Sequence, residues 1–171
     1  VLDYGSQYTL LIARRLREVG VYAEVIDGAT GHPPEGYTVQ GVILSGGPDS
    51  VTDDGSRRLP EWVLSAEVPV LGICYGLQLL VEHFGGRLRS GTAREYGNTT
   101  LLLEPYMPGQ SAQAFYGLPA SQRVWMSHGD DVHALPDCFA PVGKTEGGVI
   151  AAIVHRDRPI LAVQFHPEVH H

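Results

Sequence analysis

Residues 68–86 read VPVLGICYGLQLLVEHFGG, an apolar run that leads through a glycine-flanked cysteine into an amphipathic pattern. This order predicts a buried strand followed at once by a helix. Gly72 and Gly76 close the pentad around Cys74, and small residues there permit the strained strand-to-helix turn that presents a nucleophile above a sheet. The positive end of the helix dipole favours thiolate over thiol. We therefore interpret Cys74 as a nucleophile, against the alternative of a small buried hydrophobe.

The segments around this turn alternate between strand and helix patterns, which predicts parallel strands joined by crossover helices. After Gly86 short strands and turns follow, as in an antiparallel or mixed extension of the sheet. We expect one α/β domain of three layers, α/β/α, with a mostly parallel central sheet. A first helix is expected over about residues 7–19, with Ser6 as N-cap and Gly20 as C′ stop. Its apolar face would comprise Leu11, Ile12, Leu16 and Val19.

Composition excludes several classes of protein. The chain has 171 residues, 43% hydrophobic and 18% charged, and a formal net charge of -7. These values fit one soluble domain without a basic footprint for nucleic acid, and no stretch is long enough to span a membrane. We expect a cytoplasmic protein without a disulfide framework. The start without Met and the stop just after HPEVHH predict a domain cut from a longer polypeptide.

The last apolar run, ILAVQFHPEV, supplies a candidate base. His166 and Glu168 are two residues apart, so in an extended backbone both would point to the same face. A carboxylate that orients an imidazole suits proton transfer from and to Cys74. We expect the other histidines, His32, His83, His133 and His155, to be surface or partly packed residues, Cys138 to be structural, and no Cys/His spacing to form a metal site.

A glycine-rich stretch, SGGPDS at residues 45–50, has two interpretations. It could cradle a pyrophosphate, as in ATP pyrophosphatases, or supply an oxyanion hole. A phosphate loop would need a helix directly after Ser50, whereas the next residues are loop-like and Pro60 delays the helix. We therefore expect an oxyanion hole formed by the backbone N–H groups of Tyr75 and of Gly47, which would lie on a loop after a neighbouring parallel strand. Gly46 and Gly47 would permit a close approach of this loop and an unusual backbone angle.

Together, GICYGLQ, SGGPDS and VQFHPEV resemble the class I (triad) glutamine amidotransferases, and the similarity covers essentially the whole chain. The opening LDYGSQYTLLIARRLRE, REYG at 94–97 and VWMSHGD at 124–130 resemble the amidotransferase domains of GMP synthases within that family. The resemblance implies a flavodoxin-like core, Cys74 as nucleophile, His166 as base and acid, and Glu168 as its orienting residue. It implies glutamine contacts from Gln78, Ser127, His128, Gly129 and Asp130; without it, SHGD would be interpreted as a turn.

The resemblance also implies a function. The domain would hydrolyse L-glutamine to glutamate and ammonia, and an ATP pyrophosphatase domain, absent here, would use the ammonia and Mg-ATP to convert XMP to GMP. No cofactor is implied for this domain, and the full-length enzyme could be a homodimer. Alternatives are a glutaminase subunit of another synthase, such as anthranilate, aminodeoxychorismate or carbamoyl-phosphate synthase, a γ-glutamyl hydrolase, or an inactive regulatory module.

Overall fold

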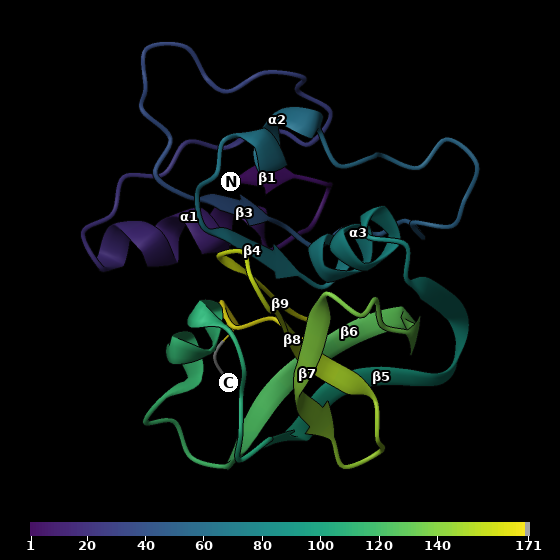
Figure 1. Cartoon of the computed structure of the whole chain (residues 1–171). Helices are drawn as coiled ribbons and strands as arrows, with labels where there is room; N and C mark the ends of the chain where they lie inside the picture. Colours follow the sequence, from purple (N-terminus) through teal and green to yellow (C-terminus); the bar gives the residue numbers. More distant parts are fainter. Residues whose placement is uncertain (170–171) are drawn as a thin grey trace.

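The computed structural model describes residues 1–169, without the side chains of residues 91–95 (Figure 1). Its strands form one nine-stranded sheet in the order β2-β1-β3-β4-β9-β8-β7-β5-β6. The first five strands in that order are mutually parallel, and the remaining four pair antiparallel. The expected mostly parallel core with a mixed extension is therefore confirmed.

The parallel half is built from short strands and three helices. Its strands are β1 (Leu2–Asp3), β2 (Ile26–Asp27), β3 (Val42–Leu44), β4 (Val70–Ile73) and β9 (Ile160–Val163). The helices are α1 (Thr9–Glu18), α2 (Glu61–Ser65) and α3 (Tyr75–His83). In the sheet, β4 lies between β3 and β9. Because these three strands are parallel, the loops that follow them lie side by side at the carboxyl ends of the strands.

The antiparallel half consists of longer strands. They are β5 (Arg87–Leu103), β6 (Ser121–Ala134), β7 (Phe139–Thr145) and β8 (Ile150–His155), with the 3-10 helix η1 (Gln110–Phe115) between β5 and β6. The sequence predicted short strands here, but β5 and β6 have 17 and 14 residues. The pairing of β5 with β6 shifts register between Ser90 and Glu95 and then resumes. The two strands are therefore long, although their side chains do not keep one two-residue alternation along the whole length. Arg94 and Glu95 of the REYG motif lie in β5, and their side chains are outside the described residues.

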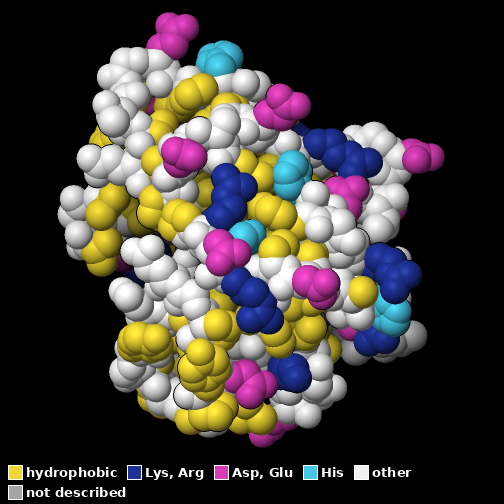
Figure 2. Space-filling view, viewed as in Figure 1, with side chains coloured by type: hydrophobic (Ala, Val, Ile, Leu, Met, Phe, Trp, Pro, Cys, Tyr) yellow, Lys and Arg dark blue, Asp and Glu magenta, His cyan; other side chains and the backbone are white. Residues whose placement is uncertain are grey.

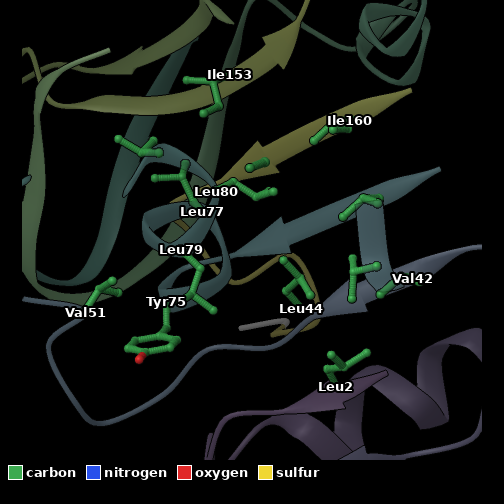
Figure 3. Close-up of a cluster of buried hydrophobic side chains, with 14 of the residues drawn as sticks. Leu2, Val42, Leu44, Val51, Tyr75, Leu77, Leu79, Leu80, Ile153 and Ile160 are labelled. Carbon is green, nitrogen blue, oxygen red and sulfur yellow. The ribbon is translucent and has the colours of Figure 1, made fainter. Parts of the chain in front are cut away.

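Helices cover both faces of the sheet, which gives the expected three layers. Val42 and Leu44 of β3 belong to one core cluster together with Leu80 of α3 (Figure 3). Trp62 of α2 belongs to the same cluster. Ile43 faces the other cluster, to which α1 and η1 contribute. The alternation along β3 follows from the two-residue period of a strand whose faces are both covered.

Helix α1 departs from the sequence prediction at both ends. It begins at Thr9, after Tyr8 in the N-cap position, while Ser6 accepts the Tyr8 N–H through its hydroxyl oxygen at 3.0 Å. Ser6 therefore caps the preceding turn and not the helix. Gly20 has φ +80° and acts as the expected C′ stop, whereas Val19 is 75% exposed and does not belong to the buried face.

Acidic and basic side chains intermingle on the face of the molecule drawn in Figure 2. Within residues 1–169, none of the helices combines the length and the apolar character needed to cross a membrane.

Candidate active site

Cys74 lies in the turn that joins β4 to α3. Its backbone has φ 53° and ψ -103°, a conformation that side-chain-bearing residues rarely adopt, and it occupies the N-cap position of α3. Its N–H donates to Val163 O of β9 at 2.8 Å, which fixes the turn against the neighbouring strand. The side chain is 4% exposed. The strained turn inferred from the sequence is thus present, with Cys74 at its apex.

The two glycines of the pentad are required by close backbone contacts. A Cβ at Gly72 would lie 2.7 Å from the carbonyl oxygen of Gly76, so the turn itself leaves no room for a side chain. A Cβ at Gly76 would lie 2.5 Å from the carbonyl oxygen of Leu44 in β3. Real Cβ atoms do not approach oxygen so closely, so both positions exclude larger residues.

His166 and Glu168 follow the end of β9 and contact each other. His166 Nδ1 lies 2.8 Å from Glu168 Oε1, and both residues are 4% exposed. The backbone is not extended here, contrary to the expectation from their spacing: Val169 N–H donates to His166 O at 3.2 Å, which closes a turn. Arg15 of α1 donates to the carbonyl oxygen of Glu168 at 3.3 Å and holds the turn from the other side.

The charge state of His166 depends on two partners. Burial lowers its pKa, but hydrogen bonds and charge interactions with Cys74 and Glu168 outweigh burial and raise the pKa to about 9. Since Nδ1 is engaged by Glu168, Nε2 is the nitrogen left for Cys74. At neutral pH this arrangement favours an imidazolium, which can form a pair with a thiolate. The ring of Tyr8 packs edge-on against His166, with centroids 5.0 Å apart.

The SGGPDS loop follows β3 and lies beside the nucleophile. A Cβ at Gly46 would be 3.0 Å from His166 Cε1 and 3.6 Å from Cys74 Cβ. At Gly47 it would be 2.8 Å from Tyr4 O and 3.3 Å from the ring of Tyr75. The expected close approach of this loop is therefore present. The unusual backbone angle expected for these glycines is not, because neither has a positive φ.

The candidate glutamine contacts on β6 converge on Asp130. The Asp130 carbonyl oxygen accepts hydrogen bonds from Gln78 Nε2 at 3.1 Å and from His128 Nδ1 at 2.9 Å. The carboxylate accepts the Ser50 hydroxyl of the SGGPDS loop at 2.5 Å. Ser127 O lies 3.5 Å from Cys74 Sγ.

The segment Ser127–Asp130 is part of strand β6, so its interpretation as a turn is wrong. Gly129 lies in the same strand, and among the described side chains a Cβ there would meet only the Tyr96 hydroxyl, at 4.0 Å. Of the five candidate glutamine contacts, Ser127 thus lies against Cys74, whereas Gln78 and His128 contact the carbonyl oxygen of Asp130.

Two contacts of this site were missed by the sequence analysis. Gln164 is fully buried, and its Nε2 lies 3.6 Å from Cys74 Sγ. The sequence could have indicated Gln164, because a polar amide side chain stands inside the apolar run ILAVQF. Trp125 O accepts the His166 N–H at 2.9 Å and ties the base to β6. No sequence signal could have found this backbone contact between distant strands.

The remaining candidates lie outside the site. His155, expected at the surface or partly packed, is 5% exposed; its Nδ1 accepts the N–H groups of Asp157 and Arg158, both at 3.1 Å. Burial, and to a lesser extent Arg158, lower its pKa. Cys138 packs against the core at an intermediate exposure, in keeping with a structural role. Among the side chains of residues 1–90 and 96–169, no three or more of His, Cys, Asp or Glu gather in a way that could hold a metal ion.

Comparison with known proteins defines the family. The model of the class I glutamine amidotransferase family matches residues 1–171. The chain belongs to this family, and it is a glutamine amidotransferase. Its structure also resembles that of a glutamine amidotransferase from Thermotoga maritima, with a TM-score of 0.76 over 98% of this chain and 71% of the other, at 24% identity, a likeness of fold.

Within the family, the chain is similar to GMP synthases. The chain is 45% identical over 172 residues to the glutamine-hydrolysing GMP synthase of Vibrio vulnificus, and 46% identical to that of Thermosipho melanesiensis. It is covered completely in both matches but spans only 32% of the length of these relatives. The crystal structure of a GMP synthase subunit protein from Thermoplasma acidophilum has a TM-score of 0.78 at 29% identity, covering 99% of this chain and 83% of the other. The resemblance inferred from the motifs is confirmed.

Proposed function

We propose that this domain hydrolyses L-glutamine through a Cys74–His166–Glu168 triad and supplies the ammonia to a synthetase domain. The observation that carries the proposal is the His166–Glu168 pair, 2.8 Å apart and buried, beside a cysteine with a strained backbone at a helix N-terminus. A buried carboxylate that holds one imidazole nitrogen leaves the other free to exchange protons with a thiol.

In the first half of the reaction, His166 Nε2 holds the proton that it has taken from Cys74, and the thiolate attacks the side-chain carbonyl carbon of glutamine. The N–H groups of Gly47 and Tyr75 are the proposed donors to the oxyanion, since Gly47 packs against Tyr75 at the end of β3. The C–N bond then breaks as the nitrogen receives the proton from His166, and ammonia leaves. A γ-glutamyl thioester remains on Cys74.

In the second half, His166 takes a proton from water, and the water oxygen attacks the thioester carbonyl. The C–S bond breaks, glutamate leaves, and the proton held by His166 restores the starting Cys74–His166 pair. Glu168 stays ionised and stabilises the imidazolium formed in both halves. Asp130 is the proposed partner of the α-ammonium group of glutamine, and Gln78, Ser127, His128 and Gly129 would complete the contacts to its α-amino-acid end.

The similarity to GMP synthases supports one acceptor. The ammonia would pass to an ATP pyrophosphatase domain, in the same polypeptide or a separate subunit, which would use Mg-ATP to convert XMP to GMP. Mg-ATP would belong to that domain, because the SGGPDS loop here borders Cys74 and His166 and is not followed at once by a helix. A homodimer of the full-length enzyme is part of the same proposal.

Glutamate release from L-glutamine tests the proposal, measured with the domain alone and with a GMP synthase ATP pyrophosphatase domain, XMP and Mg-ATP. We expect Cys74→Ala to abolish release under both conditions and Cys138→Ala, at the other cysteine, to retain it. Release that survives in Cys74→Ala would refute the nucleophile. Release that no synthetase domain increases would refute the proposed acceptor.

A further inference from the structure

Gln164 is a buried polar residue, and the oxygen of its side-chain amide has no hydrogen-bond partner among the described residues. It follows β9 directly, it is 0% exposed, and its backbone N–H donates to the Ala151 carbonyl oxygen at 2.9 Å. The described partner of its Nε2 is Cys74 Sγ, at 3.6 Å. Burying an unpaired amide oxygen is costly, so a residue of this kind needs a reason beyond packing.

The hydrogen-bonding partner that suits Cys74 Sγ changes when the thiol loses its proton. The thiol can donate to Ser127 O, 3.5 Å away. Once His166 holds the proton, that carbonyl oxygen faces an anion of its own sign and no longer stabilises it. The N–H groups of Gln164 and the His166 imidazolium are the donors that suit a thiolate. His166 is a titratable group that interacts with Cys74 directly, and Glu168 lies behind it.

We propose that Gln164 is a further catalytic residue, whose side-chain N–H stabilises the negative charge on Cys74 Sγ. The inference deepens the proposed glutaminase function and rests on it. The sulfur carries negative charge before it attacks glutamine and again when the C–S bond of the thioester breaks. One donor therefore serves both halves of the reaction. A neutral amide also keeps this role at every pH, unlike His166, which changes its protonation state during the cycle.

The reactivity of Cys74 toward iodoacetamide, measured as a function of pH, tests this role without glutamine. The Cys138→Ala background leaves Cys74 as the single thiol of the chain. Gln164→Met keeps the approximate size and removes the donor, so we expect the alkylation midpoint to move to higher pH by roughly 0.5–1 unit, a modest value for a long hydrogen bond to sulfur. Gln164→Glu should move it further because a carboxylate would repel the thiolate. The exposed Gln113→Met is the matched control and should leave the midpoint unchanged.

Two further readouts separate catalysis from packing. With glutamine as substrate, we expect kcat to fall about 3- to 10-fold in Gln164→Met with little change in KM, in line with the same shift. Because Oε1 is unpaired, Gln164→Met should unfold at the same or a higher denaturant concentration than the parent. Lower stability with an unchanged alkylation profile would assign Gln164 a structural role and overturn the proposal.

The outcomes also distinguish this inference from the proposed function. An unchanged alkylation midpoint in both folded Gln164 variants overturns the inference, even if glutamine is hydrolysed. A shifted midpoint in a domain that never releases glutamate, with or without a synthetase domain, overturns the glutaminase function and supports the contact between Gln164 and the thiolate.

Discussion

The two halves of the sheet differ in the length of their strands and in what they contribute to the site. The parallel strands have two to four residues, and the loops after β3, β4 and β9 carry the SGGPDS stretch, Cys74, and His166 with Glu168. The antiparallel strands have six to 17 residues, and β6 contributes the wall from Ser127 to Asp130. Chemical groups thus come from the carboxyl ends of short buried strands, and candidate substrate contacts come from the middle of a long strand. If this division is right, substitutions in the two halves should affect different steps.

The largest effect is expected in the parallel half, at the base. His166→Gln keeps a hydrogen-bonding side chain but cannot exchange protons, so we expect kcat for glutamine to fall by roughly 10²–10⁴-fold with a small change in KM. His133→Gln, at an exposed position, is the control and should behave as the parent. Steady-state glutamate release gives both constants. A loss confined to KM would place His166 in substrate binding and would break the proposed division between the halves.

The next effect concerns the backbone of the turn between β4 and α3. Gly76→Ala places a methyl group 2.5 Å from Leu44 O, so we expect a loss of about 3 kcal/mol in the free energy of unfolding. Among the described side chains, the methyl group of Gly129→Ala in β6 meets only the Tyr96 hydroxyl, at 4.0 Å, and this substitution should change stability by less than about 0.5 kcal/mol. Urea denaturation measures both. Equal losses at the two positions would show that the parallel half is no more tightly constrained than the antiparallel half.

The smallest effect is expected in the antiparallel half. Asp130→Asn removes the proposed charge for the glutamine ammonium group, which should raise KM by about 10- to 100-fold and leave kcat nearly unchanged. The exposed Asp54→Asn serves as control for the loss of one negative charge. A fall in kcat without a rise in KM would contradict a purely binding role for this wall.

The sequence predicted the strained turn at Cys74 and its glycines. Such a turn requires small residues at fixed positions on either side of the cysteine, and this pattern is visible in a short stretch of sequence. It also predicted that parallel strands bring SGGPDS beside that turn. It failed where distant segments decide the outcome. The length of β5 and β6 depends on pairing across register shifts, and the burial of His155 depends on the rings of Phe84 and Phe139, with centroids 5.3 and 5.1 Å away. The hydrogen bond between Ser50 and Asp130 spans 80 residues, too far for any pattern of spacing.

The central claim is that Cys74 forms a covalent bond with the glutamyl group. Rapid acid quenching during turnover of L-glutamine, followed by mass spectrometry of the intact chain and its peptides, tests it directly. We predict an adduct with the mass of glutamine less ammonia on the peptide that contains Cys74. The adduct should be present in Cys138→Ala and absent in Cys74→Ala. Continued release of glutamate without this adduct, or with the adduct on another residue, would contradict the account.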